Sequence, residues 1–97
     1  MRVLSLTNND LEGLLPSSIG FLTQLTELRL HDNKLGGSIL PSTLSSLTSL
    51  ESLFLQSNSL SGPIPSTIGS MTKLTWMDLS ENQLTGSIPS QLGHLQI

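Results

Sequence analysis

The sequence has no cysteine and no tyrosine, and only three of its 97 residues, Phe21, Phe54 and Trp76, carry aromatic rings other than imidazole. Without cysteine the chain has no disulfide, no thiolate nucleophile and no cysteine-based zinc site. Cysteine usage therefore says nothing about the redox state of its compartment.

Charge is also scarce. Charged residues make up 11% of the chain, roughly half of the usual quarter, and the net charge is −3 with four basic residues. So few cations provide no basic footprint for nucleic acid or an anionic lipid surface. We expect no nucleic acid partner and a polar surface made mainly of Ser, Thr, Asn and Gln.

Long hydrophobic runs are missing as well. No segment approaches the roughly 18 apolar residues that span a bilayer, and the N-terminus has no apolar stretch of the signal-peptide type. We expect a membrane connection only through a segment that this sequence does not contain.

The sequence does contain a repeat of about 24 residues, in which apolar residues, one asparagine and one glycine keep a fixed spacing. A period of this length predicts a stacked solenoid whose units bury their apolar faces against each other. We expect one domain, residues 1–97, with units 1–24, 25–49, 50–73 and 74–97. The equivalent positions are Met1, Leu4, Leu6, Asn9, Leu11, Gly13; Leu25, Leu28, Leu30, Asn33, Leu35, Gly37; Leu50, Leu53, Leu55, Asn58, Leu60, Gly62; and Leu74, Met77, Leu79, Asn82, Leu84, Gly86.

Each unit begins with the alternating pattern of a strand, which places Leu53 and Leu55 inward and residues 52, 54 and 56 outward. Equivalent strands predict a parallel sheet. The recurring asparagine, Asn58 in the third unit, stands where the chain turns and backbone groups lack ladder partners. We expect Asn9, Asn33, Asn58 and Asn82 to form a structural ladder rather than a ligand site.

The second half of a unit predicts a short extended segment followed by a tight turn. Gly62 permits a bend, and the two prolines of residues 61–65 restrict the backbone. Residues 66–71 predict a helical or 3₁₀ turn that buries Ile68 and Met71. The second unit has one extra residue near positions 38–41, for which we expect a bulge outside the first sheet.

The pattern Leu-x-x-Leu-x-Leu-x-x-Asn-x-Leu-x-Gly-x-Ile-Pro-x-x-Leu-Gly-x-Leu, clearest in residues 74–95, resembles the plant-specific leucine-rich repeats. The resemblance covers the whole chain. It implies an α/β repeat solenoid: a right-handed coil with a concave parallel β-sheet, a second short strand near the Gly-x-Ile-Pro segment, and convex helical or 3₁₀ turns. Proteins of this family include ectodomains of receptor-like kinases, receptor-like proteins and polygalacturonase inhibitors.

The resemblance further implies ligand recognition on the concave face and an extracellular or cell-surface location. This sequence lacks the cysteine-bearing caps of those proteins, and neither end departs from the repeat. Because terminal repeats otherwise expose the apolar side of their layer, we expect end-to-end self-association.

Catalysis has little support in the residues. His31 and His94 occupy different repeat positions, so no nucleophile, base and orienting group share a register. We expect no enzyme activity, no cofactor and no metal site, with His94 exposed in a helical turn.

The concave face offers a candidate binding site, because its outward residues fall into columns across the units. Phe54 and Trp76 both lie in these columns, and exposed aromatic residues commonly anchor interfaces. The alternative is that Phe54 and Trp76 merely pack on each other and on the stems of neighbouring side chains. The candidate ligand-binding residues are Glu27, Arg29, His31, Phe54, Gln56, Trp76, Asp78 and Ser80.

The sequence thus favours a non-catalytic recognition module, receptor-like or inhibitor-like, that binds a protein or peptide. The alternative function is that of structural spacer repeats in a larger array with no ligand of their own.

Overall fold

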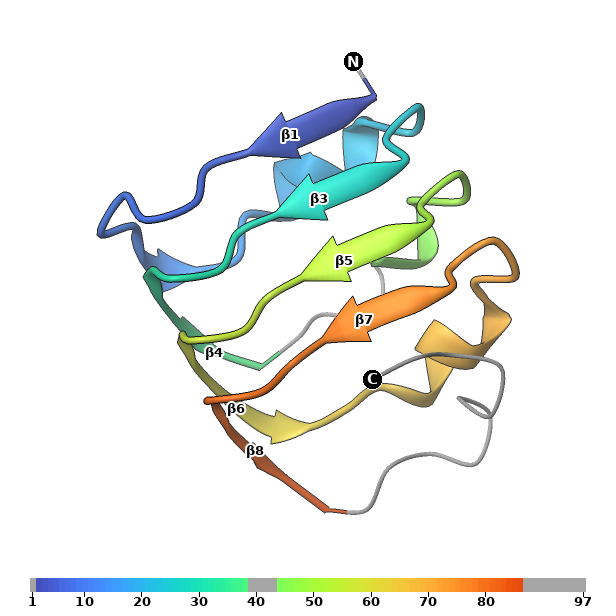
Figure 1. Ribbon diagram of the computed structural model, residues 1–97. Coiled ribbons are helices and arrows are strands. Elements are labelled where there is room, and N and C mark those ends of the chain that lie inside the picture. Colours follow the sequence, from blue (N-terminus) through green and yellow to red (C-terminus); the bar gives the residue numbers. More distant parts are fainter. Residues whose placement is uncertain (1, 39–43, 87–97) are drawn as a thin grey trace.

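The computed structural model describes residues 2–38 and 44–86, which form two parallel sheets of four strands each (Figure 1). Consecutive strands of one sheet belong to consecutive repeats, as a solenoid requires. The first sheet has the order β1 (Val3–Ser5), β3 (Glu27–Arg29), β5 (Ser52–Phe54) and β7 (Trp76–Asp78). The second has the order β2 (Glu12–Leu14), β4 (Lys34–Gly37), β6 (Ser59–Pro63) and β8 (Gln83–Thr85).

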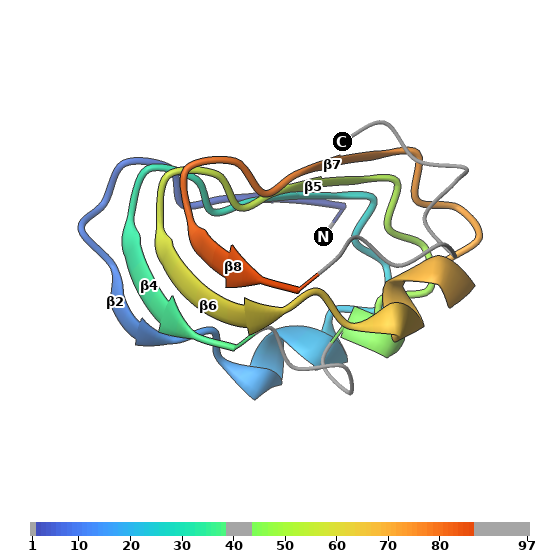
Figure 2. The ribbon, with the colours of Figure 1, turned by 90° about the horizontal axis from the view of Figure 1, so that it is seen from below.

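The two sheets and a row of short turns form three sides of the coil. Viewed from below in Figure 2, the first sheet lies along one side, the second sheet curves around the next, and the 3₁₀ helices η1 (Ser17–Phe21) and η2 (Ser66–Ser70) lie opposite the first sheet. This arrangement confirms the predicted leucine-rich repeat solenoid. None of the helices in the described ranges has the length and apolar character needed to cross a membrane.

In the first sheet, neighbouring strands pair at equivalent repeat positions. Val3 pairs with Glu27, Glu27 with Ser52, and Ser52 with Trp76. The central residues of β3 and β5, Leu28 and Leu53, point into the core and have no exposed surface. The predicted alternation of inward and outward residues is therefore confirmed.

In the second sheet, the strands are staggered relative to the repeat. Glu12 pairs with Lys34 and Ser61 with Gln83, both 22 residues apart, two fewer than the repeat period. Because side chains alternate with a period of two, an offset of two preserves which side chains face outward. The stagger makes the outward residues of this sheet line up diagonally.

The extended segment predicted for residues 61–65 is a strand only in part. Strand β6 starts earlier, at Ser59, and ends at Pro63. Pro65 keeps an extended backbone, with φ −64° and ψ 135°, but it caps the N-terminus of η2. A proline has no N–H to donate to a neighbouring strand. Strand pairing therefore ends at Pro63, although the backbone of Pro65 is still extended.

The turn predicted at residues 66–71 is confirmed as η2, which buries Ile68 completely and is followed by the buried Met71. In the first repeat, η1 buries Ile19 in the same way. The bulge expected at residues 38–41 and the exposed position expected for His94 lie outside the described residues.

Leucine side chains from all three sides of the coil fill one continuous core. Fully burying one such side chain contributes roughly 1.5–3 kcal/mol, so the periodic leucines are the main source of stability. Among the residues that the structure describes, Asn33 is the one buried polar residue.

Three of the four asparagines, Asn33, Asn58 and Asn82, form the predicted ladder, whereas the Asn9 side chain donates to the Thr7 carbonyl within its own turn. The Asn33 side-chain oxygen accepts from the backbone N–H groups of Asn9 at 2.9 Å and Leu11 at 3.0 Å, while its Nδ2 donates to the carbonyls of Leu6, Leu30 and His31. Asn58 and Asn82 each join their own turn to the preceding one in the same way. These three asparagines thereby satisfy backbone groups at the turn, although the His31 carbonyl also accepts from the Asn8 N–H.

Candidate functional site

The outward surface of the first sheet carries all eight candidate residues. We define the first-sheet face as the outward residues of its strands together with the residue two positions beyond each strand. Pairing aligns Arg29 with Phe54 and Phe54 with Asp78 in one row. The rows are Val3, Glu27, Ser52, Trp76; Ser5, Arg29, Phe54, Asp78; and Thr7, His31, Gln56, Ser80.

Phe54 lies at the centre of a cluster on this face. The Arg29 guanidinium carbon lies 5.3 Å from the centre of the Phe54 ring, a cation–π geometry. The same guanidinium is paired with the carboxylate of Glu27, two residues earlier on β3. Arg29 is therefore held in place from both sides by the protein itself.

His31 completes the cluster. Its ring centre lies 5.9 Å from that of Phe54, with the two planes tilted by 59°. Strand β3 thus supplies an acid and a base, and the position two residues beyond it supplies an imidazole, to a cluster whose central ring comes from β5. The structure brings together Glu27, Arg29, His31 and Phe54.

Two polar atoms at this cluster, His31 Nδ1 and Gln56 Oε1, are buried without a hydrogen-bond partner among the described residues. They belong to the same row on neighbouring repeats, which the Asp32 N–H joins by donating to the Gln56 carbonyl at 3.1 Å. A buried polar group with no partner costs about 1–3 kcal/mol. Both atoms are covered in the free protein, so a ligand can bond to them only if the side chains around them move.

Trp76 and Asp78 form a separate group on β7. Trp76 is 42% exposed, and no ring contact joins it to Phe54 in the described part of the chain. Asp78 Oδ1 accepts from the Ser80 N–H at 3.0 Å and from the Ser80 hydroxyl at 2.7 Å. The two rings do not pack on each other, but Phe54 packs on the neighbouring side chains of Arg29 and His31, as the alternative interpretation expects for it.

Proteins of known structure share this architecture, and the leucine-rich repeat family model matches residues 1–60 and 37–84. The chain belongs to the leucine-rich repeat family. No curated protein matches it.

Three solved structures show which leucine-rich repeat proteins are similar. The BIR3–SERK2 complex from Arabidopsis thaliana is 41% identical, with a TM-score of 0.90 over 95% of this chain and 49% of that one. PEPR1–AtPEP1 is 40% identical, with a TM-score of 0.90 over 95% of this chain and 13% of that one. A plant ice-binding protein is 42% identical, with a TM-score of 0.86 over 92% of this chain and 28% of that one. The chain therefore spans less than half the length of each.

The edge of the first-sheet face in this leucine-rich repeat chain has a feature that the sequence analysis missed. The residues just before the ladder asparagines have left-handed backbones: Asn8, Asp32, Ser57 and Glu81 have φ between 55° and 59°. Asparagine and aspartate tolerate this region better than most residues, so their occurrence at this repeat position was the available signal. The Ser57 hydroxyl donates to Glu81 Oε2 at 2.5 Å, which links two repeats along this edge.

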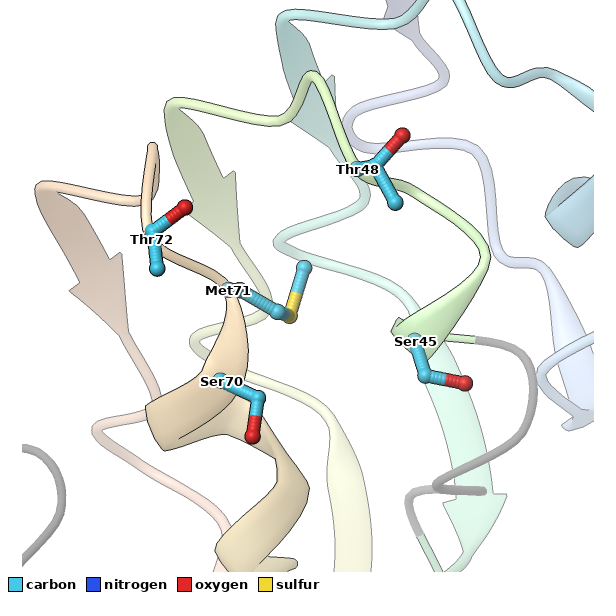
Figure 3. A pocket seen from close by; sticks show the side chains of 5 residues that line it. All are labelled: Ser45, Thr48, Ser70, Met71 and Thr72. Carbon is cyan, nitrogen blue, oxygen red and sulfur yellow. The ribbon is translucent and has the colours of Figure 1, made fainter.

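The opposite side of the solenoid has a hollow of about 210 Å³ lined by hydroxyl residues, which the sequence analysis also missed. In Figure 3, Met71 extends between two neighbouring turns, with Ser45 and Thr48 on one and Ser70 and Thr72 on the other. The four hydroxyls do not converge on one point, so the hollow lacks the convergent polar groups of a small-molecule site.

The described residues provide no set of ligands for a metal ion. Residues 2–38 and 44–86 contain no group of three His, Asp or Glu side chains arranged to hold a metal ion.

Proposed function

We propose that the chain is a non-catalytic recognition module that binds a protein or peptide on the first-sheet face. The observation that carries the proposal is the cluster around Phe54, with the unpartnered His31 Nδ1 and Gln56 Oε1 beside it. An aromatic ring held by a neighbouring arginine is a usual component of a binding hot spot. The partners of similar proteins in solved structures, SERK2 for BIR3 and AtPEP1 for PEPR1, support a protein or peptide ligand.

We place the chain outside the cell or at the cell surface, because similar structures include ectodomains such as that of BIR2. The absence of enzyme activity is part of the same proposal, since no nucleophile, base and orienting group share a repeat register.

The first test selects ligands from a random twelve-residue peptide library displayed on phage, using the immobilised 97-residue chain. We then measure the affinity of selected peptides for the Phe54→Ser and Trp76→Ser variants. Truncating an interface anchor costs more than about 2 kcal/mol at a hot spot, so we expect the two substitutions to weaken binding by more than tenfold.

The matched control is Phe21→Ser, which removes the third aromatic ring, 84% exposed and located in η1. The affinity of the Phe21→Ser variant for the selected peptides should equal that of the unchanged chain. Equal binding by all three variants would reject the first-sheet face as the site, and a library that yields no ligand would favour spacer repeats.

Ice binding is a second candidate, favoured by the similarity to a plant ice-binding protein and by a regular row of uncharged hydroxyl residues. Thr23, Thr48 and Thr72 occupy equivalent repeat positions and are all exposed, and Figure 3 shows Thr48 and Thr72 on adjacent turns. If this row binds ice, the chain should suppress ice recrystallisation, and Thr48→Lys with Thr72→Lys should abolish the effect. Ice crystals that grow as fast with the protein as in buffer alone would reject ice binding.

We also retain end-to-end self-association as a proposal. Exposed apolar residues gather in the first repeat and support it: Val3, Leu6, Leu14 and Phe21 are 54%, 37%, 68% and 84% exposed.

A further inference from the structure

We infer that the ligand of the first-sheet face is a cationic peptide segment, and that Trp76 and Asp78 receive one of its lysine or arginine side chains. This inference rests on the proposed function and names the chemistry of its partner.

Charge is unevenly distributed over the molecule, although every charged residue lies within the described ranges. The first-sheet face and its left-handed edge carry one base, Arg29, against four acids, Glu27, Asp32, Asp78 and Glu81. This surface therefore holds a charge of −3, equal to that of the whole chain. The remaining charged residues balance, three bases against three acids: Arg2, Lys34 and Lys73 against Asp10, Glu12 and Glu51.

The single base on this surface is already engaged. Arg29 pairs with Glu27 and stacks on Phe54. Asp32, Asp78 and Glu81 have no salt bridge to any base in the described part of the chain. A partner that brings cations would meet three carboxylates that the protein leaves unneutralised.

The Arg29 cluster shows how this face holds a cation. A carboxylate and an aromatic ring, Glu27 and Phe54, flank the guanidinium. Trp76 and Asp78 provide the same two groups on β7, without a cation. The two residues are separated by two positions on one strand, about 7 Å, and point to the same face.

The Trp76 ring and the Asp78 carboxylate can each still bind a group of a ligand. Trp76 is 42% exposed, and no base of the described residues stacks on its ring. Both hydrogen bonds from Ser80 go to Asp78 Oδ1, so within the described residues no donor engages Oδ2. An indole face attracts a cation, most strongly when water is excluded, and a charge-assisted hydrogen bond to Oδ2 would add direction.

The same charge distribution disfavours other partners. A phosphate backbone or an acidic peptide would meet a surface of like charge, and like-charge contacts suppress binding. An apolar segment alone would leave the Asp78 carboxylate partly desolvated without a partner, which is unfavourable.

The test uses the phage-displayed twelve-residue library on the immobilised 97-residue chain and compares the selected sequences with the unselected library. We expect enrichment of lysine and arginine. The affinity of a selected peptide should fall about tenfold for Asp78→Asn, because a charge-assisted hydrogen bond becomes a neutral one. It should also fall when the salt concentration rises, because charges on a solvated face are screened.

Asp78→Asn should fold normally, because the amide oxygen can still accept both hydrogen bonds from Ser80. The matched control is Glu12→Gln, which removes one negative charge from β2 on the second sheet and should leave the affinity unchanged. Trp76→Ala should lower the affinity for the same peptide more than tenfold.

Selected peptides without enrichment in basic residues would overturn the inference, and so would an equal response to Asp78→Asn and Glu12→Gln. If such peptides still lose affinity for Phe54→Ser, the proposed function stands and only the cationic ligand is rejected. If no peptide responds to either Phe54→Ser or Trp76→Ser, the proposed function itself fails.

Discussion

The ladder asparagines show how one side chain can hold two repeats together. Asn58 Nδ2 donates to the carbonyls of Leu30, Leu55 and Gln56, while its oxygen accepts from the Leu35 N–H. The carbonyls of Leu30, Leu55 and Gln56 also accept from Asn33 Nδ2, Asn82 Nδ2 and the Asp32 N–H. A shorter apolar side chain would remove one of two hydrogen bonds at each carbonyl and would leave the buried Leu35 N–H without its side-chain acceptor.

We therefore expect Asn58→Ala to lower the free energy of unfolding by about 2 kcal/mol, since one buried unsatisfied group such as the Leu35 N–H costs about 1–3 kcal/mol. Urea denaturation followed by circular dichroism measures the change. Asn9→Ala is the control, because Asn9 is exposed and its side chain donates only to the Thr7 carbonyl. A loss as large for Asn9→Ala as for Asn58→Ala would disprove the ladder's role.

Residue facing could be predicted from the sequence, but the contacts between outward side chains could not. Periodicity placed Arg29, Phe54 and Trp76 on one face. It did not show that the Phe54 ring would contact Arg29 and His31 while Trp76 stayed apart. Those contacts depend on side-chain rotamers, which the spacing of residues along a strand leaves undetermined.

At the level of elements, the two sheets differ in how they follow the repeat. The first sheet pairs equivalent positions, whereas the second is offset by two residues at each step. The repeat predicted the first set of strands and their parallel sheet, and the family resemblance implied a second short strand near the Gly-x-Ile-Pro segment. The stagger was not predictable because an even offset leaves the inward and outward pattern unchanged.

The facing of the second sheet gives a direct stability test. Leu60 on β6 is fully buried, whereas Leu14 on β2 is 68% exposed. We expect Leu60→Ala to cost about 3 kcal/mol, within the range for buried leucines, and Leu14→Ala less than about 1 kcal/mol. Thermal and urea unfolding would measure both, and the reverse order would contradict the assigned facing.

The whole molecule combines a continuous core with an uneven surface. Its net charge is concentrated on and beside one sheet, and its most exposed apolar side chains belong to the first repeat. The repeat pattern predicted the core. It does not predict the charge distribution, which depends on the side of the coil where each charged residue lies. These two surface features suit different contacts, one with a cationic ligand and one with apolar surface.

Self-association through the first repeat predicts a weight-average mass that rises with concentration in sedimentation equilibrium. Leu14→Lys should reduce this rise, because it places a charge on the apolar surface. Ser59→Lys is the control, since Ser59 is exposed on β6 of the same sheet and away from the first repeat. A monomer at every concentration would refute the proposal.

The central claim is that the first-sheet face is the binding surface, and amide chemical-shift mapping tests it most directly. The uniformly ¹⁵N-labelled chain would be titrated with a peptide selected from the library. We predict that the shifted amides cluster on β3, β5 and β7 and at His31 and Gln56, while those of β4, β6, η1 and η2 remain unchanged. Shifts confined to the second sheet or to the 3₁₀ turns would contradict the account.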